Sequence, residues 1–334
     1  MRIAVDVMGS DNHPEPDVHG SILAAKEFGY QIIMVGDESR INDVISRHDT
    51  TGIDLKVVPA KDVILMTDKP SVVGKLKSDS SMHVGMRLVR DGQADAFVTM
   101  GNTGAALAVA TLYTLRRIPG IKRPALSGIY PLAGKYVTML DLGANADSKP
   151  EWLVQFALMG QIYVENALTL VNPRIALLSN GEEEGKGNTL IREAGDLLAN
   201  TSLNYIGNVE PRDIVKGVAD VVITEGFVGN IFVKTFEASA SFISGAIREE
   251  ILSNPISMIG GFLMKPVFDR VRKRTDTSEI GGAPLLGVNG VVIIGHGRSD
   301  AITIKNAIYQ AALAVDGQVI TAIKSGLQSI ASTE

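Results

Sequence analysis

A glycine-rich turn at residues 179–188 carries the densest set of side chains that could do chemistry. It has the sequence Ser179-Asn180-Gly181-Glu182-Glu183-Glu184-Gly185-Lys186-Gly187-Asn188 and resembles a nucleotide-binding P-loop only superficially. Its glycines are one residue too close, and Gly187 stands where serine or threonine would bind magnesium. The three glutamates would also repel a nucleotide, so nucleotide hydrolysis is excluded. Lys186, between two glycines, could still reach a phosphate; an exposed loop lysine is the equal alternative.

Four further turns place glycine beside amide, hydroxyl or carboxylate side chains. Each follows a short β-branched run, and they lie at residues 8–10, 101–104, 141–145 and 224–230. Glycine lets backbone amides approach a ligand closely, and a helix N-terminus favours an anion. Any single turn is explained more simply by chain reversal, or by Asn230 capping a helix. Their accumulation at strand ends indicates an oxyanion or phosphate site.

His296 is the histidine most able to act in catalysis, because it follows an apolar run and stands between Gly295 and Gly297. An imidazole there could act as an acid, a base or a hydrogen-bond donor. Asp300, four positions on, gives a histidine–aspartate spacing seen in some acyltransferases. That pairing is common by chance, so it is weak evidence for an acyltransferase.

Several kinds of chemistry are disfavoured by what the chain lacks. It has no cysteine, which excludes disulfides, thiolate metal sites and a cysteine nucleophile. No Gly-x-Ser-x-Gly motif indicates an acyl-serine, Asp300 replaces the third glycine of a dinucleotide fingerprint, and no cluster of metal ligands is visible. If the protein moves acyl groups, the acceptor is expected to attack directly, with catalysis by positioning and by oxyanion stabilisation.

The composition is that of a globular chain that can bury a large core. The 334 residues are 45% hydrophobic and 21% charged, and the formal net charge of −5 gives no general attraction to nucleic acid. The N-terminus, Met1-Arg2-Ile3-Ala4-Val5, resembles a strand rather than a signal peptide, and no window is apolar enough to span a bilayer. We therefore expect a cytoplasmic protein, unless it is held at a membrane surface.

The elements that must position these side chains alternate along the chain. Strands are predicted at 2–7, 31–35, 96–100, 136–140, 174–178, 220–224 and 291–294, and more weakly at 54–58 and 125–130. Helical spacing appears at 21–28, 152–164, 190–199, 232–251 and 302–322. The alternation predicts an α/β fold with a mainly parallel sheet and helices on both faces, in three layers. We expect one catalytic unit over residues 1–334, which could have two lobes, with ligands at the carboxyl ends of the strands.

Residues 245–280 are expected to protrude as an amphipathic helical segment. Within it, basic residues follow the apolar ones, at Lys265, Arg270, Arg272, Lys273 and Arg274. Because Gly260, Gly261 and Pro266 disfavour one straight helix, two short pieces around Pro266 are predicted. The segment could lie on an anionic membrane through apolar residues that include Ile259, Phe262, Leu263 and Val267. A helical dimer interface with a solvated basic flank is the equal alternative, and the two can coexist.

Taken in order along nearly the whole chain, seven motifs and one shorter one resemble the PlsX family of phosphate acyltransferases. They are Ala4-Val5-Asp6-Val7-Met8-Gly9, Gly101-Asn102-Thr103-Gly104-Ala105, Arg123-Pro124-Ala125-Leu126, Asp141-Leu142-Gly143-Ala144-Asn145, Gly185-Lys186-Gly187-Asn188, Gly226-Phe227-Val228-Gly229-Asn230, Gly281-Gly282-Ala283-Pro284-Leu285-Leu286-Gly287 and Gly295-His296-Gly297. Two positions depart from the family. Ser10 replaces the second glycine usual after Met8-Gly9, and Glu225 stands where aspartate is common, which extends the carboxylate by one methylene.

The resemblance implies a fold like that of phosphotransacetylase and of the isocitrate and isopropylmalate dehydrogenases. It also implies transfer of a fatty acyl group from acyl carrier protein to inorganic phosphate, for phospholipid synthesis, without cofactor or metal. The implied partners are acyl carrier protein, phosphate, a second copy in a homodimer, the inner face of the plasma membrane, to which the protein would bind peripherally, and the downstream glycerol-phosphate acyltransferase.

With this reaction in view, the turns are given specific roles as a hypothesis. Lys186 holds the phosphate, while Asn230 and backbone amides orient it toward the thioester. His296 and Asn102 bind or polarise the carbonyl, and an apolar channel near the protruding segment takes the acyl chain. The residues expected to contact phosphate or substrate are Gly9, Asn102, Thr103, Gly104, Asn145, Ser179, Asn180, Gly187, Glu225 and Gly229.

Three other functions fit parts of the pattern. A phosphotransacetylase would run acyl chemistry between coenzyme A and phosphate, and donor competition separates it from the first reading. A non-catalytic metabolite-binding or membrane-scaffold protein would keep the fold without cleaving a thioester. A dehydrogenase is disfavoured because the dinucleotide fingerprint is missing, although relatives of that fold bind nicotinamide without it.

Overall fold

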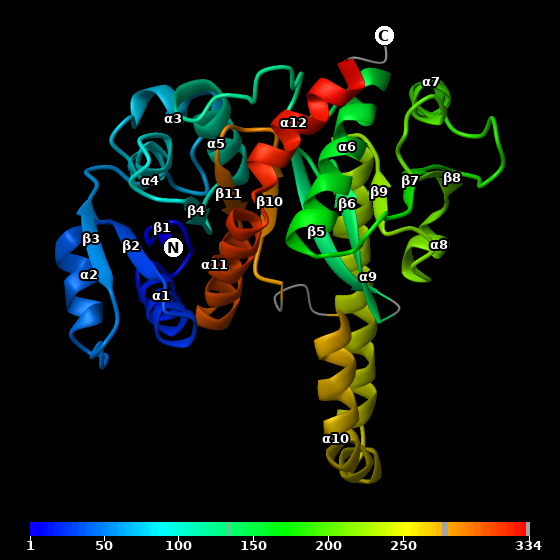
Figure 1. Cartoon of the computed structure of the whole chain (residues 1–334). Coiled ribbons are helices and arrows are strands. Elements are labelled where there is room, and N and C mark those ends of the chain that lie inside the picture. Colours follow the sequence, from blue (N-terminus) through cyan, green and yellow to red (C-terminus); the bar gives the residue numbers. More distant parts are fainter. Residues whose placement is uncertain (133, 276–279, 332–334) are drawn as a thin grey trace.

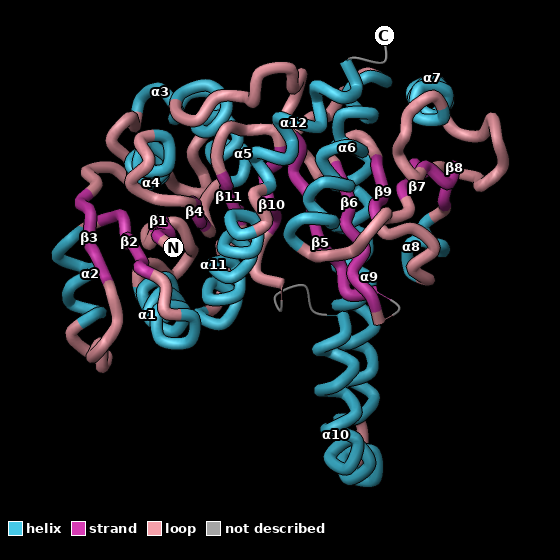
Figure 2. The backbone as a smooth tube through the Cα atoms, in the orientation of Figure 1, coloured by secondary structure: helices cyan, strands magenta, loops and turns pink. Residues whose placement is uncertain are grey.

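A single sheet of eleven strands runs through the protein (Figure 1, Figure 2). The computed structural model describes residues 1–132, 134–275 and 280–331. Within them the strand order is β3-β2-β1-β4-β11-β10-β5-β6-β9-β7-β8. The strands are β1 (Arg2–Asp6), β2 (Gln31–Gly36), β3 (Leu55–Pro59), β4 (Ala96–Thr99), β5 (Ala125–Leu132), β6 (Lys135–Leu140), β7 (Ile175–Leu178), β8 (Tyr205–Val209), β9 (Val221–Ile223), β10 (Ala283–Leu286) and β11 (Val291–Ile294).

Most neighbouring strands run parallel, but the sheet reverses direction in its middle. β10 pairs antiparallel with both β11 and β5, and β5 pairs antiparallel with β6. The other pairs are parallel. As a consequence β1 to β5 and β11 run one way, whereas β6 to β10 run the other. The predicted mainly parallel sheet is confirmed, with a reversal that the sequence pattern did not indicate.

Helices cover both faces of this sheet. Besides α9 and α10, whose bounds are given below, the helices are α1 (Glu15–Phe28), α2 (Glu38–Ile45), α3 (Pro70–Leu76), α4 (Ser81–Arg90), α5 (Thr103–Ala108), the π-helical turn η1 (Val109–Tyr113), α6 (Pro150–Ala167), α7 (Thr189–Ala199), α8 (Pro211–Val215), α11 (Ala301–Asp316) and α12 (Val319–Ala331). Several begin at a residue whose side chain caps the first turn, such as Asp37, Ser80, Asn188 and Asp300.

Alternate residues of the buried strands pack against opposite helical layers. Ile3 and Val5 of β1 belong to a core cluster with residues of α1, α6 and α11. Ala4, between them, belongs to a second cluster with residues of α4 and α5. In the other half of the sheet, Val137 and Met139 of β6 pack with residues of α8 and α9. Since strands expose successive side chains to opposite faces, this pattern confirms the three-layer α/β/α prediction.

β8 and β10 were not predicted from the sequence, and one predicted helix is two helices in the structure. β8 is partly exposed, and β10 contains Pro284 inside the sheet, a residue that normally argues against an interior strand. The expected helix over 302–322 is two helices, because the chain turns between Asp316 and Val319. There Gln318 adopts a left-handed backbone conformation with φ 49°, which ends α11.

α9 (Gly226–Leu252) and α10 (Pro255–Thr275) leave the body of the protein as a helical hairpin (Figure 1). The predicted break at Pro266 is wrong, because α10 continues through it. Packing of α10 along α9 holds the helix together despite the lost backbone donor. Gly261 promotes this packing, since a Cβ there would lie 2.4 Å from a side-chain carbon of Ile251. The basic side chains of Arg272, Lys273 and Arg274 lie outside the described residues.

Candidate functional site

The reversal of the sheet separates the glycine turns into two groups. The turns after β1, β4 and β11 lie at one edge of the sheet, named here the first edge, which carries Gly9, Asn102, Thr103, Gly104 and His296. The turns after β6, β7 and β9 lie at the other edge, named here the second edge, which carries Asn145, Ser179, Asn180, Lys186, Gly187, Glu225, Gly229 and Asn230. A parallel sheet would have placed all of these turns at one edge, as predicted from the sequence. Because the sheet reverses, that prediction is wrong.

Asp141 organises the second edge. Its side chain is fully buried and accepts hydrogen bonds of 2.7–3.2 Å from four backbone N–H groups and one side-chain amide, those of Leu126, Gly143, Ala144 and Asn145. Burial raises the pKa of Asp141, and these donors oppose that rise. Because its oxygens are occupied by the protein itself, Asp141 shapes the turn and is not a general base.

Asn145 and Glu225 are likewise used within the turns. Asn145 donates from Nδ2 to the Pro124 carbonyl at 2.7 Å, and its own carbonyl accepts from Gly226 N–H at 2.8 Å. Glu225 caps α9 by accepting from the N–H groups of the next turn, at 2.6 and 2.9 Å. A carboxylate in that position satisfies the helix N-terminus and repels a second anion. Phosphate binding at the start of α9 is thereby disfavoured.

Gly229 and Asn230 hold α9 against the turn that Asp141 organises. A Cβ at Gly229 would lie 2.0 Å from the Asp141 carbonyl oxygen, so only glycine permits this approach. Asn230 donates from Nδ2 to the Leu142 carbonyl at 3.1 Å. This bond uses one of the two Nδ2 hydrogens of Asn230. Asn230 therefore holds the helix against this turn.

Lys186 is the one basic residue of the 179–188 turn, and its side chain is exposed. Asn180 Oδ1 accepts from Gly187 N–H at 3.1 Å, with Ser179 Oγ 3.5 Å away, and closes the turn. The stem of Lys186 crosses Gly181, where a Cβ would lie 2.9 Å from the lysine Cγ. Lys186 is exposed, and its ammonium group forms no ion pair with any residue that the structure describes. The turn thus presents one free positive charge.

At the first edge a buried carboxylate joins the turns of β1 and β4. Asp6 accepts from Thr99 Oγ1 at 2.8 Å and from Met8 N–H at 3.1 Å. Thr99 Oγ1 in turn accepts from Gly101 N–H at 3.0 Å. Burial raises the pKa of Asp6. Gly9 fits here because a Cβ would lie 2.9 Å from Gly101 N. Sequence reasoning did not select Asp6, although a carboxylate that ends an apolar strand is an available signal.

Asn102 fixes a neighbouring loop through its side-chain amide. Its Oδ1 caps α5 at 3.0 Å, and its Nδ2 donates to the carbonyls of Met66 and Asp68, both at 3.1 Å. Thr103 is the first residue of α5 and is exposed, whereas Gly104 packs closely on α3. The loop at residues 65–68 is thereby tied to the end of β4.

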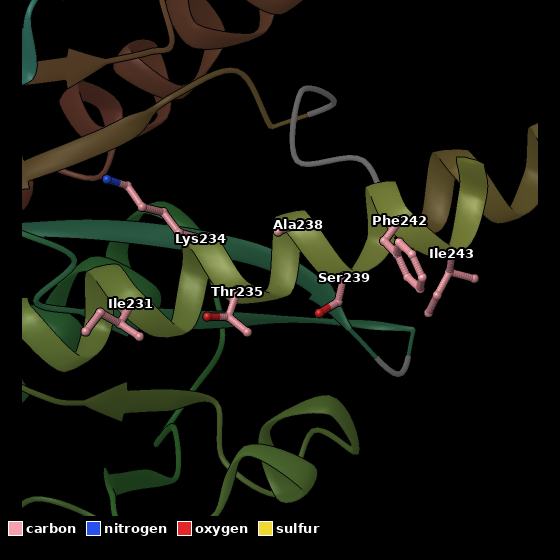
Figure 3. A pocket seen from close by; sticks show the side chains of 7 residues that line it. All are labelled: Ile231, Lys234, Thr235, Ala238, Ser239, Phe242 and Ile243. Carbon is pink, nitrogen blue, oxygen red and sulfur yellow. The ribbon is translucent and has the colours of Figure 1, made fainter. Parts of the chain in front are cut away.

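His296 marks the point at which α9 reaches the first edge. Its side chain is 70% exposed, and Nε2 lies 3.9 Å from Glu237 Oε1 of α9. Glu237 follows Lys234 by three residues and Asn230 by seven, so the three share one side of the helix. Figure 3 shows the Lys234 side chain pointing away from Thr235. α9 therefore starts at the second edge and carries polar groups to the first.

The adjoining side of α9, which Lys234 borders, is mostly apolar and open. It forms a groove of about 740 Å³ lined by Ile231, Lys234, Thr235, Ala238, Ser239, Phe242 and Ile243 (Figure 3). Phe242 is 77% exposed. The apolar surface continues on α10, where Ile259, Phe262 and Leu263 are exposed, whereas Val267 is partly buried.

Ser10 and Asp17 form a buried pair beneath the first edge. Ser10 Oγ donates to Asp17 Oδ2 at 2.5 Å, and Asp17 Oδ1 has no hydrogen-bond partner among the residues that the structure describes. Burial raises the pKa of Asp17 to about 7. Ser10 is the residue that replaces a usual glycine of the resembled family, and the pair was not visible in the sequence because seven residues separate its members.

Comparison with known proteins decides the family. The family described as "Fatty acid synthesis protein" matches residues 1–322. Proteins described as "Phosphate acyltransferase" are similar over almost the whole chain. That of Trichlorobacter lovleyi is 46% identical over 92% of this chain and 89% of its own length, and that of Dictyoglomus turgidum is 45% identical over 99% and 98%. The chain belongs to this family. It is an acyltransferase of the PlsX family, as its motifs indicated.

Solved structures confirm the fold. A phosphotransacetylase from Streptococcus pyogenes superposes with a TM-score of 0.63 at 17% identity, over 96% of this chain and 94% of that one. A branched-chain phosphotransacylase from Enterococcus faecalis V583 gives 0.58 at 16% identity, over 94% and 99%. At these identities the likeness shows a shared architecture, which is the phosphotransacetylase-like fold expected from the motifs.

Among residues 1–132, 134–275 and 280–331, no helix is both long and apolar enough to cross a membrane. The same residues include no group of three or more histidine, aspartate or glutamate side chains arranged to hold a metal ion.

Proposed function

We propose that this protein transfers a long-chain fatty acyl group from acyl carrier protein to inorganic phosphate, forming an acyl phosphate for phospholipid synthesis. The observation that carries the proposal is the family match over residues 1–322, with relatives named phosphate acyltransferase at 44–46% identity. That match spans both edges of the sheet and all of the glycine turns. The carrier and the pathway are supported by the resemblance of the motifs to the PlsX family.

The residues present favour direct attack by phosphate. The chain has no cysteine and no Gly-x-Ser-x-Gly motif, so no acyl-enzyme is indicated. A phosphate oxygen would bond to the thioester carbonyl carbon while the carbonyl oxygen takes up negative charge. Collapse of that intermediate breaks the carbon–sulfur bond, and the departing thiolate takes up a proton. Catalysis then depends on holding both reactants in place and on donors aimed at the oxyanion.

Hydrogen bonds within the protein reduce the number of side chains that are available to bind the substrates. The amides of Asn102, Asn145 and Asn230 already donate to backbone carbonyls, so we assign them to shaping the turns. Lys186 keeps a free ammonium group, and His296 keeps an exposed imidazole. We retain Lys186 as the phosphate ligand if the reaction takes place at the second edge, and His296 as the donor to the carbonyl if it takes place at the first edge. Because the two lie at different edges, single substitutions will show which edge holds the reacting groups.

The helical hairpin supports the proposed association with a membrane and with a second copy. Its apolar side chains are unusually exposed for a soluble helix: Ile256 by 83%, Phe262 by 76% and Leu263 by 72%. Burying such side chains in an interface stabilises it by about 25 cal/mol per Å² of apolar surface. We propose that residues near the hairpin tip contact the inner face of the membrane and that the body of the hairpin pairs with a second copy.

A reconstituted assay tests the reaction. Purified protein is mixed with palmitoyl acyl carrier protein and inorganic phosphate, thiol release is followed, and acyl phosphate is trapped with hydroxylamine. Phosphate-dependent release with trapped product is expected. Release from palmitoyl-coenzyme A in preference to the carrier substrate would instead identify a phosphotransacetylase-like enzyme, and absence of release from both donors would overturn catalysis altogether.

A further inference from the structure

The loop between η1 and β5 carries an unpaired positive surface. No aspartate or glutamate occurs between Asp95 and Asp141, although the whole protein has a formal net charge of −5. Within this acid-free stretch four basic residues lie close together and are all exposed: Arg116, Arg117, Lys122 and Arg123. Clustered like charges repel one another, so the cluster does not stabilise the fold by itself. We name these four residues the basic loop surface.

The basic loop surface has no acidic partner of its own. Among the residues that the structure describes, none of the four cations forms an ion pair. Arg116 donates to the Leu112 carbonyl of η1, and Arg117 donates to the Lys122 carbonyl of the loop. Arg123 lies over the ring of Trp152, with its guanidinium carbon 5.0 Å from the ring centroid. Their remaining donors face solvent and are available to an external anion.

The loop is held rigidly, which favours recognition. Ile118 and Ile121 are 1% and 4% exposed and anchor it in the core. Gln155 of α6 bridges it, donating to the Gly120 carbonyl at 3.0 Å and accepting from Lys122 N–H at 2.8 Å. A surface that is already ordered loses little conformational entropy when a partner binds. The charges are thus displayed in a fixed arrangement.

The position of this surface indicates which anion it meets. Pro124, next to Arg123, accepts a hydrogen bond from Asn145 Nδ2 at 2.7 Å, so the loop adjoins the second edge and its glycine turns. The exposed hairpin emerges at the opposite end of β5, and the eight residues of β5 separate the two by roughly 26 Å. A bilayer that contacts the hairpin tip would not also contact the loop.

We propose that the basic loop surface docks an acidic face of the protein that delivers the acyl group. The inference rests on the proposed function for the identity of the partner, whereas the positive charge of the surface rests on the structure alone. Arginine is suited to such a contact because it binds carboxylates in a bidentate manner. Docking here brings the partner beside the turns of the second edge.

Charge reversal tests the proposal. The double variant Arg116→Glu/Arg117→Glu is compared with Lys56→Glu/Lys61→Glu, which reverses two exposed cations at the far end of the sheet. With palmitoyl acyl carrier protein as the probe, the first variant is expected to raise KM about tenfold or more, with kcat and the KM for phosphate unchanged. Raising NaCl from about 50 to 300 mM weakens binding of the parent and not of the variant. The control variant behaves as the parent does.

Binding measured without turnover separates this proposal from the proposed function. Calorimetric titration with the carrier protein is carried out on the parent, the reversed variant and the neutral variant Arg116→Gln/Arg117→Gln, whose affinity is expected to be intermediate. Equal affinities in all three, with melting temperatures unchanged, would overturn docking at this surface even if catalysis is confirmed. Loss of binding to anionic vesicles in the reversed variant, with carrier binding unaffected, would reassign the surface to membrane contact.

Discussion

At the scale of single residues, Asp17 makes stability depend on pH. Burial raises the pKa of Asp17 to about 7, above the ordinary value near 4 that it regains on unfolding. The folded state therefore holds a proton that the unfolded state releases. This contribution to stability is complete below about pH 4 and is lost as pH rises through about 7.

Replacing Asp17 by Asn is expected to remove this dependence, because the amide oxygen still accepts from Ser10 and carries no charge. Relative to the parent, the free energy of unfolding of Asp17→Asn rises by roughly 2–3 kcal/mol between pH 5 and pH 8. Urea titrations at several pH values measure it. Asp37→Asn is the control. The hydrogen bond from Ser39 lowers the pKa of the exposed Asp37, so this substitution changes the pH dependence of stability only at more acidic pH. Parallel stability curves for Asp17→Asn and the parent would contradict the assignment.

Lys186 and Lys234 lie at different points of the candidate site, and neither forms an ion pair with a residue that the structure describes. Comparing variants of the two locates the phosphate. Lys186→Ala is expected to lower turnover about a hundredfold if its ammonium group stabilises the transition state. Lys234→Ala and the distant Lys56→Ala are expected to have little effect. Steady-state kinetics with varied phosphate measure this. Unchanged turnover and phosphate KM in Lys186→Ala would remove that lysine from the mechanism, and a loss confined to Lys234→Ala would place the phosphate at the first edge.

The sequence indicated which glycine turns follow strands, and it was less informative about what each side chain does there. Asn102, Asn145 and Asn230 were expected to meet substrate, yet each donates to a backbone carbonyl. An asparagine that shapes a turn and one that binds a ligand look alike in a sequence, because the difference lies in which acceptor reaches its amide. Asp6 and Asp17 were not selected. Thr99 lies 93 residues from Asp6 along the chain, and Ser10 and Asp17, seven residues apart, are brought together only by folding.

At the scale of elements, α9 contains one glycine with no room for a side chain and one glycine with open space around it. At Gly229 a Cβ would lie 2.0 Å from the Asp141 carbonyl oxygen, whereas at Gly245 a Cβ would meet nothing within 4 Å. Gly229→Ala is therefore expected to destabilise the protein by about 1–3 kcal/mol or more through overpacking. Gly245→Ala is expected to raise stability by up to about 1 kcal/mol.

Thermal unfolding of both variants, followed by calorimetry, checks this pair. The two substitutions add the same methyl group to the same helix, so a difference in helix propensity does not explain opposite signs. Equal shifts of the melting temperature would mean that α9 does not approach Asp141 as closely as the structure indicates.

The prediction of elements succeeded where hydrophobic periodicity was strong and failed where packing overrides local preference. Nine strands were expected at nearly their observed positions, because β-branched runs buried on both faces are easy to recognise. β10 was missed because Pro284 disfavours an interior strand, and α10 was expected to break at Pro266. In both cases neighbouring elements supply contacts that outweigh the missing backbone donor.

At the scale of the whole molecule, the reversal of the sheet was beyond the reach of sequence patterns. It depends on β10 lying between β11 and β5, and strand neighbours far apart along the chain leave no periodic signal. The consequence for function is that α9 becomes the element linking the two edges, from Gly229 at one to Glu237 near His296 at the other. The same helix then extends into the hairpin, which joins the site to any surface that the hairpin contacts.

The membrane association of the hairpin gives the last prediction. Leu263 is 72% exposed on α10, and a carboxylate at that position would be costly to bury in an anionic interface. Leu263→Glu is expected to abolish flotation of the protein with vesicles that contain anionic lipid. Val171→Glu, which charges an 86% exposed residue outside the hairpin, is the control and is expected to float as the parent does. Flotation of Leu263→Glu equal to that of the parent would contradict membrane contact. If sedimentation then showed that Leu263→Glu had become monomeric, the apolar surface of α10 would instead belong to the interface between two copies.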